Sequence, residues 1–171
     1  MSVTPRVLLV SDESPLVELL SNRVPRGTFE MKTVACPREA LAVAEKSDID
    51  IVVLNLKEMM AEGVLFLRSL RQSRPLIEVI TLSIPSAMRL SIEGMKLGVF
   101  ADLQMPLDLD DLTGKIKEAW ERKKARSGGL SLRRRLESLA AAVSFAEAGA
   151  FDASRGILAE GTDAGPNQEE E

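Results

Sequence analysis

The segment Ile49–Gly63 reads IDIVVLNLKEMMAEG, and its first half is a nearly unbroken apolar run that ends at Asn55. Apolar residues that are mostly β-branched suit a strand buried on both faces of a parallel sheet, so this run predicts the central strand of an α/β fold. Lys57 and Glu58 follow Asn55 closely. An open α/β sheet places its ligand crevice at the carboxyl ends of its central strands, and we therefore expect Asn55 to lie at the functional site.

The same alternation of strand and helix patterns extends over most of the chain. Proline, glycine and serine mark the boundaries between these patterns. The expected strands are Arg6–Val10, Thr28–Val34, the central run, Ile77–Leu82 and Val99–Leu103, and the expected helices begin near Ser14, Pro37, Gly63, Ala87 and Leu109. Strands that alternate strictly with helices predict a parallel sheet with helices on both faces, joined by right-handed crossovers.

The composition narrows the classes of protein that the chain can represent. Its 171 residues suit one domain with an appendage, and a net charge of −4 gives no global reason to expect nucleic acid or an anionic membrane as partner. Histidine is absent and Cys36 is the only cysteine, which excludes histidine-based catalysis, an internal disulfide and a zinc cluster. Because no apolar run is long enough to span a membrane and MSVTPR does not resemble a signal peptide, we expect a cytoplasmic protein.

Several short motifs occur in an order that resembles the receiver domain of bacterial two-component response regulators. They are VLLVSDE near the start, TLS in the middle and EGMKLGVFADLQMPLDLDDL, in which glycine, proline and apolar spacing agree with one another. The resemblance extends over about residues 5–125. It implies a flavodoxin-like domain at residues 1–126, with five helices and five parallel strands in the order 2-1-3-4-5.

Receivers carry an acidic pair that holds magnesium, an aspartate that accepts the phosphoryl group, and a hydroxyl residue and a lysine that contact that group. The positions of this chain that match them are Ser11 and Asp12 for the acidic pair, Asn55 for the phosphoacceptor, Ser83 for the hydroxyl and Met105 for the lysine. Together with the nearby Glu13 and Lys57, they form the expected pocket. Because several of the functional groups are replaced, the resemblance implies a degenerate, or pseudo-receiver, form.

The replacements predict that the pocket does not accept a phosphoryl group. The Asn55 amide has no anionic oxygen for nucleophilic attack, and Met105 has no positive charge to pair with a phosphoryl oxygen. Magnesium prefers several hard oxygen ligands, including carboxylates. The pocket lacks the carboxylates that Ser11 and Asn55 replace and gains the positive charge of Lys57, so Asp12 and Glu13 alone should bind magnesium poorly. We therefore expect no catalytic residues, no bound metal, no cofactor and no enzymatic activity.

The leading interpretation is a phosphorylation-independent interaction module with protein partners in a signalling pathway. Asp102 stands where receivers usually carry an aromatic switch residue, and we expect it to pair with Arg89 on a surface that holds one conformation. One alternative is a response regulator that uses Asp12 or Glu13 as acceptor, and another is a structural subunit with a receiver-like fold. Nucleic-acid binding is more distant, because the basic residues 122–135 lack interleaved aromatics and are typical of a solvated helix face.

The chain beyond residue 126 has a different composition, rich in alanine and leucine. Arg126-Ser127-Gly128-Gly129 predicts a flexible break, and residues 127–160 predict a helical hairpin, with one helix ending near Gly149 and a second from Asp152 to Ala159. We expect an apolar seam of this hairpin to contact a second copy of the chain or another partner; it consists of Leu132, Leu136, Leu139 and Val143. Residues 161–171 predict a disordered acidic tail.

Overall fold

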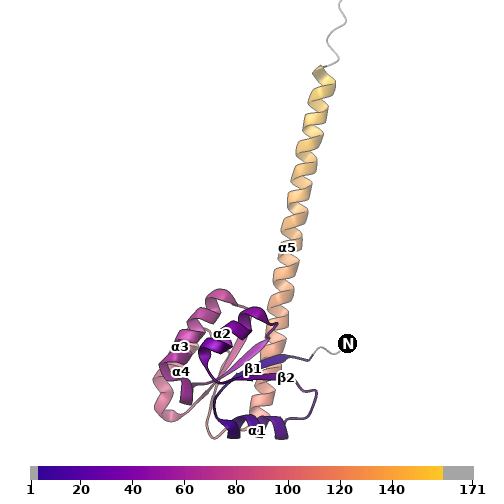
Figure 1. The fold of residues 1–171 in the computed structure, drawn as a ribbon. Coiled ribbons are helices and arrows are strands. Elements are labelled where there is room, and N and C mark those ends of the chain that lie inside the picture. Colours follow the sequence, from indigo (N-terminus) through magenta and orange to yellow (C-terminus); the bar gives the residue numbers. More distant parts are fainter. Residues whose placement is uncertain (1–3, 160–171) are drawn as a thin grey trace, which may run out of the picture. The chain divides into compact units, whose positions relative to one another are not determined.

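The structure is a computed structural model that describes residues 4–159, with side chains described for residues 4–141 apart from Ser14. The chain divides into two units, Met1–Ser127 and Gly128–Glu171. The first unit contains a sheet and the helices that cover it, and the second contains the later part of one long helix (Figure 1). The acidic tail predicted at residues 161–171 lies outside the described residues.

One five-stranded parallel sheet forms the centre of the first unit. Its strands are β1 (Arg6–Val10), β2 (Glu30–Val34), β3 (Ile51–Asn55), β4 (Glu78–Ser83) and β5 (Ala101–Gln104). They lie in the order β2-β1-β3-β4-β5, which confirms the flavodoxin-like arrangement. β2 starts later than the expected Thr28, because the amide and hydroxyl of Thr28 both donate to the carbonyl of Pro25 and close a turn there.

Helices cover both faces of the sheet, as Figure 1 shows. They are α1 (Ser14–Arg23), α2 (Pro37–Lys46), α3 (Leu56–Ser73), the short 3₁₀ helix η1 (Pro85–Ala87), α4 (Met88–Lys96) and α5 (Leu109–Ala159). The central strand β3 alternates between the two cores that result. Val52 and Leu54 pack with α2, α3 and α4, whereas Ile51 and Val53 pack with α1 and the first part of α5.

α3 begins directly at the end of β3, earlier than the expected start after Gly63. The Asn55 side chain makes this start possible, because its amide oxygen accepts a hydrogen bond from the Lys57 amide at 3.2 Å and caps the first turn. Met60 interrupts the helix with a φ of 43°, a left-handed conformation that is uncommon outside glycine. Gly63 follows in close contact, since a Cβ there would lie 2.9 Å from a methyl carbon of Leu56.

The division into units after Ser127 agrees with the domain boundary predicted at residue 126, whereas the predicted flexible break and helical hairpin are wrong, because α5 is helical from Leu109 to Ala159. Residues 126–129 and Gly149 lie inside it. Each glycine in a helix interior costs only about 1 kcal/mol relative to alanine, and the neighbouring leucine, arginine, glutamate and alanine residues are strong helix formers. In the described part of the chain, none of the helices has both the length and the apolar character that a bilayer crossing requires.

Lys123 and Arg126 contact the sheet instead of lying on the solvated helix face that the sequence had suggested. The other basic residues of this stretch are exposed as expected: Arg122, Lys124 and residues 133–135. Lys123 donates to the carbonyl of Ile49 at 2.9 Å and to a carboxylate oxygen of Asp50 at 2.7 Å. Arg126 donates to the carboxylate of Glu78 at 2.7 Å, and that side chain is 0% exposed. These side chains therefore tie α5 to the amino ends of β3 and β4 rather than presenting free charge to a nucleic acid.

Candidate functional site

The pocket that the sequence predicts lies at the carboxyl edge of the sheet. In the strand register Val10 lies opposite Leu54, and Asn55 lies opposite Leu82, so the residues at these strand ends share one edge. The side chains of Ser11 and Asn55 meet there, because the Asn55 amide nitrogen donates to the Ser11 hydroxyl at 3.4 Å. Asn55 is completely buried.

Glu58, on the first turn of α3, completes this cluster. One of its carboxylate oxygens accepts from the Ser11 hydroxyl at 3.1 Å and from the Asp12 backbone amide at 2.9 Å. The Ser11 hydroxyl in turn accepts from the backbone amide of Glu13 at 3.2 Å. Sequence reasoning missed Glu58 as a site residue, although its place one helical turn after the end of the central strand is a usable signal.

The second carboxylate oxygen of Glu58 is buried and has no hydrogen-bond partner. Burial raises the pKa of Glu58 above its ordinary value of 4.5, and the nearby charge of Asp12 adds to that effect. Hydrogen bonds from the Asp12 amide and the Ser11 hydroxyl act in the opposite direction but do not cancel it. The pocket therefore contains a carboxyl group whose neutral form is favoured more than that of an ordinary glutamate.

Lys57 places a positive charge at the mouth of the same pocket. Its ammonium group forms an ion pair and hydrogen bond with the Glu13 carboxylate. This hydrogen bond, together with the charge of Glu13, raises the pKa of Lys57. At this edge an ordinary receiver directs carboxylate charge at magnesium, whereas here the Glu13 carboxylate pairs with Lys57 of the same chain.

The residues present do not fit the magnesium ion of ordinary receivers. Magnesium needs hard oxygen ligands in near-octahedral geometry at about 2.0–2.1 Å. Here the Glu13 carboxylate pairs with Lys57, and the Asn55 oxygen is used by the start of α3. Within the described residues, no three His, Cys, Asp or Glu side chains are arranged to hold a metal ion.

Ser83 and Asp102 form a separate polar group on β4 and β5. The Ser83 hydroxyl donates to one Asp102 oxygen at 2.8 Å, and the Thr81 hydroxyl donates to the other at 2.6 Å. The expected pairing of Asp102 with Arg89 is therefore wrong, and among the described residues Arg89 makes no ion pair.

The remaining predicted positions do not join the pocket cluster. Met105 is half-buried after β5, where its backbone amide donates to the carbonyl of Ser83 at 2.8 Å. In the second unit, Leu132, Leu136 and Leu139 are exposed. The side chain of Val143, the last residue of the predicted seam, lies outside those described.

Comparison with known proteins agrees with this geometry. The family described as response regulator receiver domain matches residues 7–117. The chain is 28% identical over 120 residues to the transcriptional regulatory protein PrrA of Mycobacterium tuberculosis, covering 70% of this chain and 52% of PrrA. It is 28% identical over 122 residues to the transcriptional regulatory protein GlrR of Escherichia coli, covering 71% of this chain and 28% of GlrR.

A solved receiver domain protein, described as CheY-like, from Methanospirillum hungatei has the same fold with a TM-score of 0.66. It is 22% identical, and the match covers 72% of this chain and 99% of that structure. The match covers about half of PrrA and less than a third of GlrR, so most of GlrR and about half of PrrA lie outside it. The family match, the strand order and the placement of the pocket agree, and the chain belongs to the family of response regulator receiver domains.

Proposed function

We propose that this chain is a pseudo-receiver, a signalling module that binds protein partners without being phosphorylated. The observation that carries the proposal is the state of the pocket, where Lys57 pairs with Glu13 and the Asn55 amide is hydrogen-bonded on both sides. The Glu13 carboxylate and the Asn55 amide thus find their partners within the chain, without magnesium or a phosphoryl group. We place its action in the cytoplasm, where two-component pathways operate.

The chemistry of the pocket supports the same conclusion step by step. Nucleophilic attack on a phosphoryl donor needs an anionic oxygen at the end of β3, and the Asn55 amide has none. Stabilisation of the transferred group needs a cation after β5, and Met105 is neutral. The Ser83 hydroxyl, a further contact in ordinary receivers, donates to Asp102 instead.

The main alternative is phosphorylation of Asp12 or Glu13. Asp12 favours it by being exposed, whereas Glu13 is tied to Lys57. Among the described residues, no three His, Cys, Asp or Glu side chains are arranged to hold the metal ion that such a transfer would use, and we rank this alternative second. A structural subunit with the same fold is the third interpretation. The mass experiment below does not separate it from the pseudo-receiver, because neither is phosphorylated. Capture of a signalling protein by this chain would separate the two.

We expect no aspartyl phosphate on this chain under conditions that phosphorylate ordinary receivers. Losing one electrostatic contact commonly slows a reaction by about 10² to 10³, and losing the nucleophile costs more, so transfer should be undetectable. The measurement is intact mass after incubation with acetyl phosphate and magnesium, with an ordinary receiver as positive control. A hydroxylamine-sensitive adduct on Asp12 or Glu13 would favour the alternative.

The double variant Asn55→Asp with Met105→Lys is the matched comparison. It restores a carboxylate at the end of β3 and a cation after β5 without altering the two cores. We expect it to gain at least weak magnesium binding, which tests whether the scaffold itself is sound. If the double variant and the parent both bind magnesium equally, the degenerate pocket is not what separates this chain from its relatives.

A further inference from the structure

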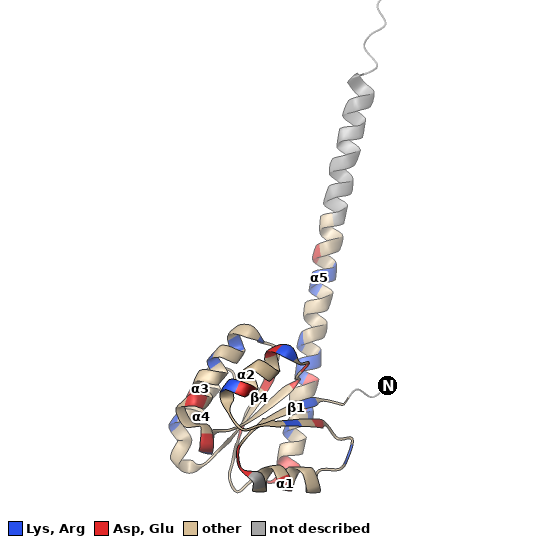
Figure 2. Cartoon of the chain, viewed as in Figure 1, with Lys and Arg blue, Asp and Glu red and all other residues tan. Residues whose placement is uncertain are grey.

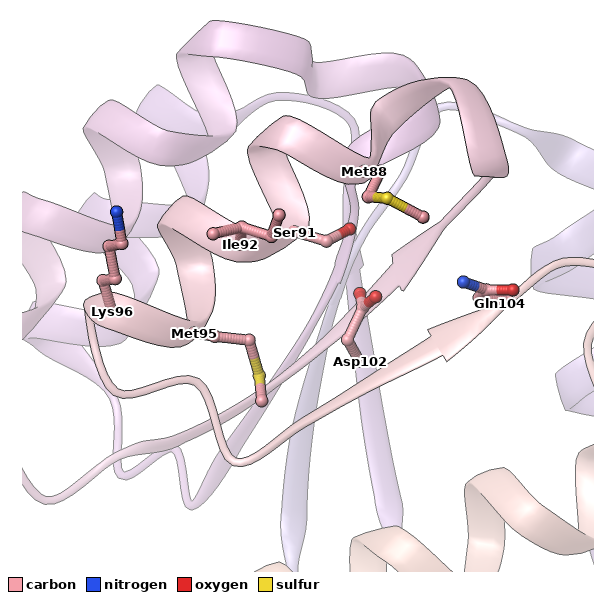
Figure 3. A pocket seen from close by; sticks show the side chains of 7 residues that line it. All are labelled: Met88, Ser91, Ile92, Met95, Lys96, Asp102 and Gln104. Carbon is pink, nitrogen blue, oxygen red and sulfur yellow. The ribbon is translucent and has the colours of Figure 1, made fainter.

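A pocket of about 570 Å³ lies between α4 and β5, and Asp102 is part of its lining. Figure 3 shows its lining from close by. One wall is formed by Met88, Ile92 and Met95 of α4, and the polar part of the lining comes from Ser91 and from residues of β5.

The α4 wall is apolar and open to solvent. Met88 is 55% exposed, Ile92 52% and Met95 55%, although their spacing places them along one side of a helix. Exposed apolar area costs about 25 cal/mol per Å² compared with burial, so a ligand that covers these side chains gains free energy. Methionine side chains are flexible and polarizable, and they adapt well to an aliphatic chain lying across them.

The Asp102 carboxylate gives this pocket a negative charge. Its two oxygens accept hydrogen bonds from Thr81 and Ser83, which are both neutral, and within the described residues no cation pairs with it. In Figure 3 the carboxylate rises from β5 toward α4. Each oxygen retains acceptor capacity for a further hydrogen bond, because a carboxylate offers about four lone-pair sites.

Ser91 supplies a second, independent sign that the pocket receives a ligand. The residue is only 9% exposed, and its hydroxyl oxygen is buried without a hydrogen-bond partner. In Figure 3 the hydroxyl points from α4 into the same space as Asp102. Because buried polar groups in proteins are normally satisfied, a group that hydrogen-bonds to this hydroxyl removes an unfavourable feature of the free protein.

Lys96 is the cation nearest to this lining, and it does not neutralise Asp102. It lies at the carboxyl end of α4, and Figure 3 shows its side chain leading away from the carboxylate. The charge of Asp102 is therefore available to a positive group from outside the chain.

We propose that this pocket binds a basic side chain, best an arginine, of a protein partner. The aliphatic part of that side chain lies along Met88, Ile92 and Met95, and the guanidinium donates to Asp102 beside the Ser91 hydroxyl. Arginine suits the site because its planar fork offers several donors to one carboxylate and is weakly hydrated. The inference rests on the proposed function as an interaction module, and it adds the chemistry by which a partner is recognised.

The test uses the full chain with ¹³C-labelled methionine methyl groups and n-butylguanidinium as probe. We expect saturable shifts of the Met88 and Met95 signals, assigned from Met88→Leu and Met95→Leu variants. n-Butylurea, which has nearly the same shape without the charge, should bind at least about tenfold more weakly, because charge-assisted hydrogen bonds are lost.

Two variants locate the charge. Asp102→Asn should weaken binding of n-butylguanidinium by about tenfold or more. Its amide oxygen still accepts from one of the two hydroxyls of Thr81 and Ser83, and the other hydroxyl can accept from its amide nitrogen. Glu62→Gln is the matched control, since Glu62 is an exposed carboxylate on α3 outside the pocket, and it should leave the affinity unchanged. The comparison of the two probes on the unaltered protein does not depend on how either variant folds.

Two results would overturn the inference. Equal binding of n-butylurea and n-butylguanidinium would make the pocket an apolar site for an aromatic or aliphatic side chain, and unmoved Met88 and Met95 signals would show that it takes neither. These outcomes are separate from the proposed function. A chain that takes no phosphate but does not bind the probe remains a pseudo-receiver with a different contact, whereas an aspartyl phosphate on a chain that binds the probe removes the proposed function alone.

Discussion

Two side chains, Asn55 and Met105, give the pocket at the end of β3 different hydrogen bonds and charges from those of an ordinary receiver. An amide at Asn55 can donate to the Ser11 hydroxyl and accept from the Lys57 amide at once, which a carboxylate cannot do. An aspartate there would also add negative charge beside Glu58, with Met105 unable to balance it. The amide at 55 and the neutral side chain at 105 therefore compensate each other, and Glu58 becomes the buried acid of the site.

Glu58 should make stability depend on pH in a defined direction. Its folded pKa is raised, so its stabilising contribution is complete below the ordinary value of 4.5 and is lost as pH rises through the folded pKa. We expect Glu58→Gln to gain stability relative to the parent protein as pH is raised from 4 to about 8. Urea midpoints across that range measure the difference, with Glu62→Gln, at an exposed position of α3, as the control for replacing a glutamate. If the stability of the parent protein instead rises relative to that of Glu58→Gln as pH increases, the burial of Glu58 is contradicted.

At the scale of elements, α5 is held to the sheet by ion pairs as well as by its apolar side. Leu112 and Ile116 are buried in the same core as residues of β1 and β3. Further along α5, Arg126 donates to the buried Glu78 carboxylate of β4. Arg122 lies 3.6 Å from the same carboxylate oxygen. A fully buried carboxylate without a paired cation is unfavourable, so the buried Glu78 side chain depends on these arginines for its stability.

Arg126→Ala should destabilise the first unit by about 3 kcal/mol, because it leaves Glu78 buried with only the more distant Arg122. The second change Glu78→Gln in that background should recover much of the loss, which a double-mutant cycle in urea measures. Arg133→Ala is the control on the same helix, since its pair with Glu137 is exposed and should contribute less than about 1 kcal/mol. Equal losses for Arg126→Ala and Arg133→Ala would show that Glu78 does not need its partner.

At the scale of the whole molecule, charge and exposed apolar residues are distributed differently in the two units. Figure 2 shows basic and acidic residues interspersed over the elements of the first unit. In the second unit, Leu132, Leu136 and Leu139 are exposed at spacings of four and three, which is a heptad pattern on one side of a helix. A helix that exposes such a stripe is stabilised when a partner covers it.

We propose that a second copy of the chain covers this stripe. Leu136→Asp together with Leu139→Asp should shift the sedimentation profile toward monomer while the sheet unit stays folded, because charges in a leucine seam cannot be buried. Ser131→Asp together with Ser138→Asp adds the same charge off the leucine stripe, more than about 100° around the helix from its centre, and should leave the profile unchanged. A parent chain that sediments as monomer at all concentrations rules out self-association through this stripe.

The sequence determined the class of fold and the missing chemistry. A continuous, mostly β-branched apolar run such as Ile51–Leu54 suits a strand buried on both faces, and its regular alternation with helical patterns indicates a parallel sheet. The identities of Asn55 and Met105 likewise decide which groups are absent, because no folding can give an amide a negative charge. These features depend on neighbouring residues or on a single side chain, and they can be read along the chain.

The tertiary structure decided which partners each polar residue takes. Asp102 bonds to Thr81 and Ser83 rather than to Arg89 because the register of β4 and β5 places those hydroxyls beside it. Glu58 enters the pocket because α3 starts at the end of β3, and Arg126 reaches Glu78 because α5 continues past it. Pairings between residues distant in sequence depend on register and on where helices begin and end, and the local pattern of residues does not encode these.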